Sequence, residues 1–208
     1  MIELYFWLTD NGRKALQGIE ETGLAYQRRP VDLTKKEQFS PDFMKISPGH
    51  KIPALVDDAG PGGARISLCE SGAILKYLAE KAGGALYPAA PTARAKVDQW
   101  FFYGSSTFTP IAQQYGHFWL RSPIDVPQAK AHFAALMRDM FEVLDRHLAD
   151  NAYLAGDFSI ADISVYPDAH LHGKLGIGFA EYPSLARWHD AIAARPATER
   201  AWSATGAA

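Results

Sequence analysis

The chain has 208 residues, of which 48% are hydrophobic, so it can bury a sizeable core and form one or two domains. Its net charge of -2 comes from interspersed charges and includes no basic stripe, which excludes nucleic acid as an expected partner. No signal peptide or bilayer-length apolar run is recognisable, so we expect a cytoplasmic protein without a membrane partner.

The first eighty residues alternate between strand and helix patterns. Apolar periodicity and turn residues predict, in chain order, a strand at 2–7, a helix ending at Gly23, a strand at 25–31, a short irregular helix within 35–46, a hairpin of strands at 52–56 and 65–68, and a helix ending near 82. This order of strands and helices is typical of the thioredoxin-like fold.

A Gly- and Pro-rich segment at 83–91 has the composition of an interdomain linker, and helical patterns follow it. Seven apolar residues between Phe133 and Leu148 repeat every 3.6 positions and predict a core helix. Ser159 and Asp162 predict a capping box at a further helix. We therefore expect an α/β thioredoxin-like domain at 1–82, a linker at 83–91 and an all-α domain at 92–208.

Ile52 and Pro53 begin a predicted strand after the turn Ser47-Pro48-Gly49. A cis bond between them would turn the Ile52 N–H and C=O outward to pair with an extended peptide. An ordinary proline at the start of a strand explains the isolated pattern equally well.

Glu70 and Ser71 lie where a strand ends and a helix begins, with Ser71 predicted as the N-cap. The first amides of a helix can hold an α-carboxylate, and Glu70 can pair with the neighbouring α-ammonium group. Together these groups could bind an amino-acid head group, although a serine N-cap alone is most often only a cap.

Taken together, the segments IPALVDD, CESGAILKYLAEK and SIADIS resemble the glutathione transferase superfamily over nearly the whole chain. The stretches YFWLTDNGRK, EQFSPDFMKISPGHKIPAL and LCESGAILKYLAEK are most similar to the bacterial nu class, which is related to the yeast prion-like glutathione-binding proteins.

The resemblance implies a role for each matching residue. The Ile52 backbone beside a cis Pro53 would pair with the cysteinyl unit of glutathione, and Glu70 and Ser71 would hold its γ-glutamyl end. Gln38 and Lys51 would contact the glycyl or backbone portion of glutathione. The competing interpretation is that both are exposed, solvated side chains.

Glutathione attacks as a thiolate, so the protein must supply a group that stabilises the sulfur anion. Thr9 and Asn11 lie where the first strand ends and a helix begins, and could act with the positive helix end. Turn chemistry and an N-cap would also explain both residues. Strand alternation does not exclude Tyr5, which is otherwise an aromatic core residue. The nu-class resemblance favours Thr9 and Asn11 as the catalytic pair.

The chain has one cysteine, Cys69, and therefore no C-x-x-C pair, so thiol chemistry needs sulfur from another molecule. The resemblance implies reduction of small disulfides, and of peroxides, with glutathione as co-substrate, bound as one or two molecules or as its disulfide. Conjugation of glutathione to an electrophile and a non-catalytic glutathione-binding regulatory module remain alternatives. No metal is expected, and the resemblance implies a homodimer.

Overall fold

The computed structural model describes residues 1–206 and divides the chain into two compact units. The first unit contains Met1–Tyr87 and the segment that begins at Arg195, and the second contains Pro88–Ala194. The units divide within the segment at 83–91, and the last helix groups with the first unit. That the ranges 1–82 and 92–208 are separate folding domains stays a prediction. Residues 207 and 208 lie outside the described residues.

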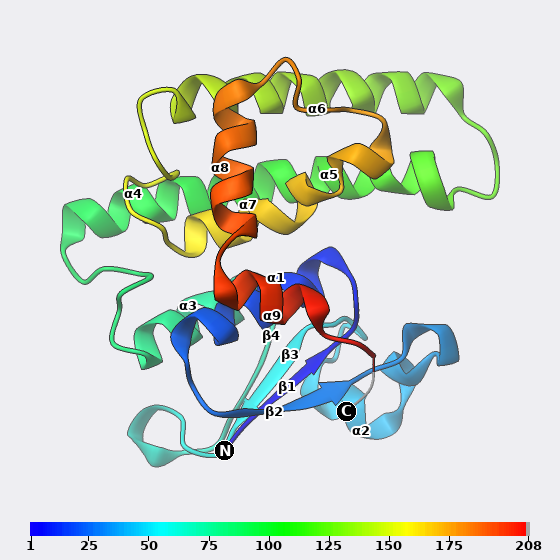
Figure 1. Ribbon diagram of the computed structural model, residues 1–208. Helices are drawn as coiled ribbons and strands as arrows, with labels where there is room; N and C mark the ends of the chain where they lie inside the picture. The colour runs from blue at the N-terminus through cyan, green and yellow to red at the C-terminus, as the bar shows by residue number, and fades with distance from the viewer. Residues whose placement is uncertain (207–208) are drawn as a thin grey trace. The chain divides into compact units, whose positions relative to one another are not determined.

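Four strands of the first unit form one sheet in the order β2-β1-β3-β4 (Figure 1). Strand β1 runs parallel to β2 and antiparallel to β3, and β3 runs antiparallel to β4. The strands are β1 Ile2–Phe6, β2 Tyr26–Pro30, β3 Ala54–Asp57 and β4 Ile66–Cys69. This mixed sheet confirms the predicted thioredoxin-like architecture.

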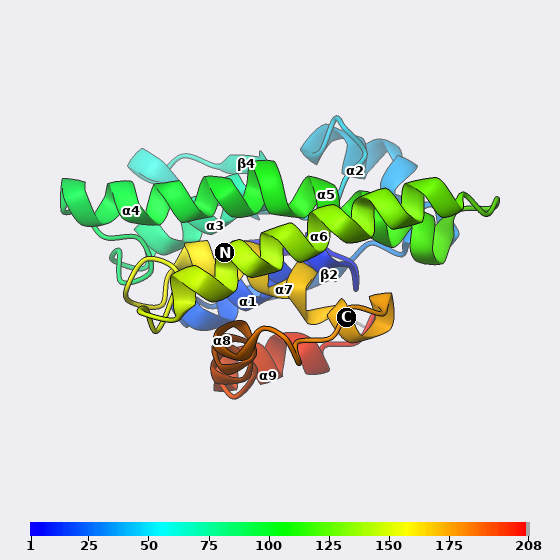
Figure 2. The same cartoon turned by 90° about the horizontal axis from the view of Figure 1, so that it is seen from above.

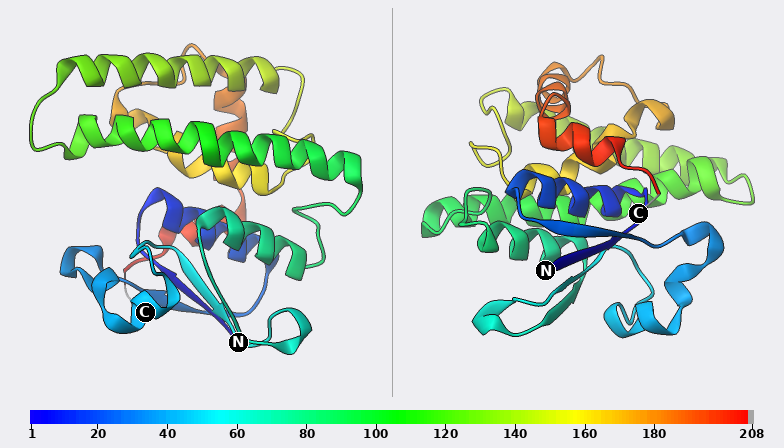
Figure 3. Two further views of the ribbon diagram at one scale, coloured as in Figure 1. Left: turned by 180° about the vertical axis from the view of Figure 1, so that it is seen from behind. Right: turned by 60° about the horizontal axis from the view of Figure 1, so that its bottom comes forward.

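Helices cover both faces of this sheet (Figure 3). Leu4 and Phe6 point to the face covered by α1, α3 and α9, whereas Tyr5 packs with Phe43 of α2 on the other face. Gly23 ends α1 with a φ of 66°, as its sequence position predicts. The helices are α1 Asp10–Thr22, α2 Pro41–Ile46, α3 Ser71–Lys81 and α9 Pro196–Ser203.

Helix α9 returns to the first unit because specific contacts hold it beside α1. Gln17 donates a hydrogen bond of 2.8 Å to the Thr198 hydroxyl, and both residues are buried. At the start of α9, Arg195 forms an ion pair of 2.6 Å with Glu21. These contacts explain why the last helix does not group with the helices that precede it.

The second unit is helical, with α5 packed against α6 (Figure 2). Its helices are α4 Pro91–Phe102, α5 Thr109–Gly116, α6 Pro127–Leu148, α7 Ile160–His170 and α8 Pro183–Ala193. π-helical turns at Tyr103–Phe108 and His117–Arg121 interrupt the helical segment that follows the linker. Within residues 1–206, no helix has the length and apolar character needed to cross a bilayer.

The predicted capping box is confirmed at the start of α7. Asp162 accepts a hydrogen bond of 2.9 Å from the Ser159 amide, and the Ser159 hydroxyl accepts one of 3.2 Å from the Ala161 amide. Asp162 also accepts a bond of 2.8 Å from the indole of Trp188. The carboxylate therefore connects α7 with α8 and has a structural role.

Asp57 is a buried carboxylate at the end of β3. Burial alone would raise its pKa, but hydrogen bonds from Lys81, Tyr77 and the Ala59 amide lower it to about 2. Because this pKa lies below that of an unfolded aspartate, ionised Asp57 stabilises the folded state above about pH 4. The stabilisation is lost as the pH falls through 2.

We predict that Asp57→Asn removes roughly 2 kcal/mol of unfolding free energy at pH 5, and that roughly half of this difference disappears at pH 3. Urea unfolding at both pH values measures the change. Asp58→Asn, at the exposed neighbouring carboxylate, provides the same charge change as a control. A difference between wild type and Asp57→Asn that is independent of pH would contradict the prediction.

Candidate functional site

Strand register brings three segments of the predicted site to one edge of the sheet. Tyr5 of β1 pairs with Ala54 of β3, and Ala54 pairs with Cys69 of β4, so these residues form one row across three strands. Because β3 runs opposite to its neighbours, the C-terminal ends of β1 and β4 meet the N-terminal end of β3. Thr9, Ile52 and Glu70 all belong to segments at this edge.

The first segment is the N-terminus of α1, where Thr9 is the N-cap. Its hydroxyl accepts a hydrogen bond of 3.2 Å from the Gly12 amide, and within the described part of the chain no acceptor takes the hydroxyl proton. The Asn11 side-chain oxygen is buried and has no hydrogen-bond partner among residues 1–206. The structure confirms the capping role of Thr9 and leaves polar groups of both residues uncommitted.

Gly12 is a residue of this segment whose role the sequence analysis missed. A Cβ atom at Gly12 would lie 2.0 Å from the main-chain oxygen of Trp7. Only glycine therefore allows the first turn of α1 to approach the end of β1 so closely. The sequence signal was the turn-prone TDNG run, which indicates a turn but gives no information about distance.

The second segment contains a cis peptide bond between Ile52 and Pro53. Pro53 is buried, whereas Ile52 is partly exposed and packs with the α2 side of the sheet. Among the described residues, neither the N–H nor the C=O of Ile52 has a hydrogen-bond partner. Both main-chain groups are therefore free to pair with a bound peptide.

The third segment corrects one expectation. Ser71 was expected to be the N-cap of α3, but Glu70 occupies that position, with φ 70° and ψ 119°, and Ser71 is the first helical residue. No side chain caps this helix. A left-handed φ at a glutamate is strained by about 1–3 kcal/mol, a cost that often marks a functional position.

Glu70 is exposed, and its carboxylate forms no ion pair with any described residue. It stands beside the first amides of α3, which no side chain caps and which carry the positive end of the helix dipole. A negatively charged carboxylate and the positive end of a helix therefore lie side by side at the end of β4.

The two remaining predicted residues belong to the connection between β2 and β3. Gln38 lies in a 3₁₀ turn at Glu37–Phe39, and its side-chain oxygen is buried without a partner in the described chain. Lys51 is exposed and directly precedes Ile52. The Phe39 and His50 rings, 5.4 Å apart, hold the 3₁₀ turn beside the chain at Lys51.

His50 was expected to be a solvated or hydrogen-bonded histidine, and its conformation was not predicted. Its Nδ1 atom is buried without a partner among residues 1–206, and its backbone has a φ of 54°. The sequence contained no signal for this conformation, because SPGHK indicates a turn without showing which residue takes the left-handed backbone.

Tyr5, the alternative sulfur-activating residue, is committed elsewhere. Its hydroxyl donates a hydrogen bond of 3.1 Å to Glu3, which is ion-paired with Arg29. Burial, and then the bond to Glu3, raises the pKa of Tyr5 above its ordinary value. Tyr5 also lines a separate pocket of about 540 Å³ near α2. The Tyr5 hydroxyl therefore already donates its hydrogen bond to a carboxylate of the same strand.

The first unit has a mixed four-stranded sheet with helices on both faces, and the second unit is all-helical. These two units define the class of protein: a thioredoxin-like domain followed by a helical domain. The family model "Glutathione S-transferase, N-terminal domain" matches residues 3–80, and "Glutathione S-transferase, C-terminal domain" matches residues 108–196. The chain therefore belongs to the glutathione transferase superfamily, as its motifs predicted.

Three similar proteins refine this assignment. The disulfide-bond oxidoreductase YfcG of Escherichia coli is 41% identical over 97% of this chain and 94% of its own length. A glutathione transferase from Pseudomonas putida, with one glutathione disulfide bound per subunit, is 32% identical with a TM-score of 0.90, covering 97% of this chain and 90% of its own. A glutathione transferase from Burkholderia graminis, with two glutathione molecules bound per subunit, is 32% identical with a TM-score of 0.92. The match covers 98% of this chain and 88% of the Burkholderia chain.

We predict that Gly12→Ala lowers the unfolding free energy by about 3 kcal/mol, because the new methyl group would collide with the Trp7 carbonyl. The sign is informative, since alanine normally favours a helix over glycine by about 1 kcal/mol. Urea unfolding measures the change. Gly178→Ala, where a Cβ meets nothing within 4 Å, is the matched control and should stay close to wild type. Equal stability of Gly12→Ala and wild type would contradict the close approach.

Proposed function

We propose that this protein is a glutathione-dependent disulfide-bond oxidoreductase of the cytoplasm, reducing small disulfides and, by the same thiolate chemistry, peroxides. The observation that carries the proposal is the meeting of three segments at one edge of the sheet: Thr9 with Asn11, Ile52 with Pro53, and Glu70 with Ser71. The similarity to the oxidoreductase YfcG supports the reaction type.

The dimensions of this edge fit a tripeptide. Neighbouring strands lie about 4.8 Å apart, so the distance across β1, β3 and β4 is roughly 10 Å. An extended chain of three residues has a length of roughly 10 Å. Glutathione can therefore reach from the α1 N-terminus to the α3 N-terminus while its middle residue pairs with Ile52.

At the α1 end, Thr9 and Asn11 stabilise the glutathione thiolate. The Thr9 hydroxyl can donate a hydrogen bond to the sulfur while its oxygen still accepts one from the Gly12 amide. The positive end of α1 adds a favourable field for an anion. Tyr5 is a weaker candidate because its hydroxyl already donates a hydrogen bond to Glu3.

At the α3 end, the uncapped first amides and the Ser71 hydroxyl receive the γ-glutamyl α-carboxylate, and Glu70 receives its α-ammonium group. Gln38 and Lys51 contact the glycyl or backbone portion. The unpartnered oxygen of Gln38 supports a role as an acceptor for a ligand amide.

The redox balance needs two glutathione molecules for each disulfide. One thiolate attacks the substrate disulfide, forms a mixed disulfide and releases a substrate thiolate, which takes up a proton. A second glutathione thiolate then attacks the mixed disulfide, releasing the second substrate thiol and leaving glutathione disulfide. Both electrons come from glutathione, because the chain has the single cysteine Cys69.

We predict that Glu70→Gln weakens glutathione binding about tenfold or more, since it removes a charge-assisted bond to the α-ammonium group. Isothermal titration with glutathione measures this change. Glu199→Gln, an exposed carboxylate on α9, has the same charge change and should bind like wild type. Wild-type affinity in Glu70→Gln would remove Glu70 from the site.

We predict that Thr9→Ala and Asn11→Ala each lower the turnover of a small model disulfide about ten- to hundredfold, with glutathione binding largely retained. Thr9→Ala should also shift the pH profile upward, because the bound thiol loses a stabilising donor. Thr9→Ser, which keeps the hydroxyl and the helix cap, should restore turnover, and Tyr5→Phe should stay close to wild type.

The alternatives give different results in the same assay. Turnover of an aryl halide with no turnover of disulfides would indicate glutathione conjugation. Glutathione binding with neither activity, unaltered by Thr9→Ala, would indicate a regulatory glutathione-binding module.

The homodimer also stays a proposal. Exposed apolar side chains such as Phe39 and Phe102, each 54% accessible, are surfaces that a second copy could cover.

A further inference from the structure

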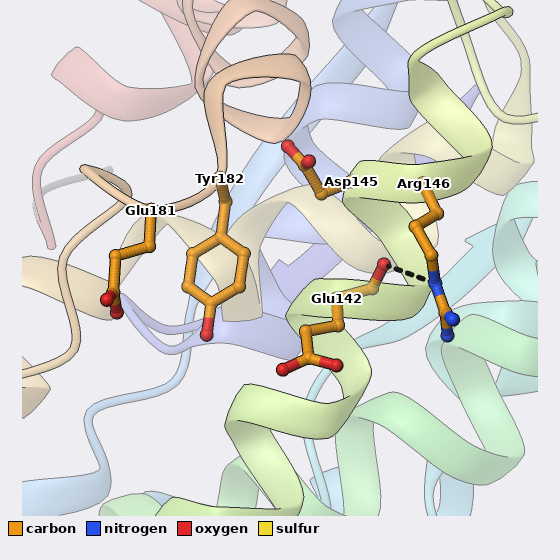
Figure 4. A pocket seen from close by; sticks show the side chains of 5 residues that line it. All are labelled: Glu142, Asp145, Arg146, Glu181 and Tyr182. Atoms are coloured by element: carbon orange, nitrogen blue, oxygen red, sulfur yellow. Dashed lines mark hydrogen bonds between the residues drawn. The ribbon is translucent and has the colours of Figure 1, made fainter.

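A separate pocket of about 250 Å³ lies in the second unit, between α6 and the chain that leads into α8 (Figure 4). Helix α6 contributes Glu142, Asp145 and Arg146, and the segment before α8 contributes Glu181 and Tyr182. The proposed glutathione site uses none of these residues. Three of the five are carboxylates, so the pocket has an excess of negative charge.

Tyr182 is the buried polar residue of this pocket, with 6% of its surface exposed. Its ring packs edge-on against Phe141, with ring centroids 5.6 Å apart, and its amide donates a hydrogen bond of 2.9 Å to Phe179. Figure 4 shows the hydroxyl pointing into the pocket between the Glu142 and Glu181 side chains. No described residue forms a hydrogen bond with this hydroxyl, and its oxygen is not among the buried unpartnered atoms, so it is open to the pocket and to solvent.

Burial, and then the charges of Glu181 and Glu142, raises the pKa of Tyr182 above its ordinary value. Arg138 opposes this effect and Asp139 adds to it. The phenol oxygen can accept a hydrogen bond from a ligand ammonium group. The packing against Phe141 holds it in place before any ligand arrives.

The charged groups of the pocket are not all available to a ligand. Asp145 caps α8, because its carboxylate accepts bonds of 2.7 and 2.9 Å from the Ser184 and Leu185 amides. Arg146 donates from Nε to the main-chain oxygen of Glu142, at 3.4 Å. Glu142 and Glu181 are both exposed, and neither carboxylate forms an ion pair with a described residue. These two groups therefore remain open to a cation.

The open groups favour an organic cation over a metal ion. Among the described side chains, which do not include that of His172, no cluster of three His, Cys, Asp or Glu is placed to hold a metal. An ammonium group needs fewer oxygen atoms around it, and it donates hydrogen bonds in separate directions. The volume of 250 Å³ equals that of roughly eight liquid water molecules, which suits a chain of about six heavy atoms.

We propose that this pocket binds a small aliphatic diamine, with the Glu142 and Glu181 carboxylates receiving its ammonium groups and the Tyr182 hydroxyl accepting from one of them. Two carboxylates on either side of the hydroxyl match a ligand with two cationic ends. The site stands independently of the proposed reductase function.

The test is isothermal titration of the full chain with 1,4-diaminobutane at low salt, with 1,4-butanediol as the uncharged analogue of the same length. We expect one diamine per chain and no binding of the diol. Glu142→Gln and Glu181→Gln should each weaken binding about tenfold, and Tyr182→Phe several-fold. Asp150→Asn removes one exposed carboxylate of the same unit outside the pocket and should leave the affinity unchanged. Binding should also weaken at high salt.

Glu70→Gln provides a further control, because Glu70 could itself attract an ammonium group. Diamine binding that survives Glu70→Gln and falls in Glu142→Gln supports the pocket. The opposite pattern would assign the binding to the glutathione site and overturn the proposal. No binding to wild type, equal binding of the diol, or an affinity unchanged in both pocket glutamine variants would also overturn it. Thermal unfolding of each variant confirms that the chain remains folded.

Discussion

The hydrogen-bonded register of β1, β3 and β4 is the constraint on which the candidate site depends. Tyr5, Ala54 and Cys69 lie side by side, so every residue just beyond them at this edge is placed by the ladder. A slip of one residue in β1 would turn Leu4 and Phe6, both fully buried, out of the core. Burial of apolar side chains therefore holds the polar edge in position.

The electrostatic character of that edge follows from the same register and from short connections. Only Trp7, Leu8 and Thr9 separate β1 from α1, and Glu70 alone separates β4 from α3. Such short connections place both helix N-termini at the strand ends, where their dipoles favour anions. The local costs appear at the same places: only glycine fits at position 12, and Glu70 takes a left-handed backbone.

Much of the fold was predictable because its signals are local. Apolar periodicity, the stop at Gly23 and the capping box of Ser159 and Asp162 each depend on neighbouring residues. The unpredicted features depend on contacts between distant residues. The ion pair of Arg195 with Glu21 brings α9 to the first unit. For the candidate site, the sequence indicated which segments carry polar groups. The left-handed backbone of Glu70 and the hydrogen bond from Tyr5 to Glu3 are visible only in the three-dimensional structure.

Two sets of unpaired carboxylates in this chain differ in what surrounds them, and that difference determines which ligands they suit. Glu70 stands beside uncapped amides of α3, so a ligand there can satisfy a cationic and an anionic group at once, as an amino-acid head group does. At the pocket of Glu142 and Glu181, the nearest helix N-terminus, that of α8, is already capped by Asp145. No positive helix end remains for a ligand carboxylate at that N-terminus. A zwitterion would therefore bind there less well than a ligand with ammonium groups alone.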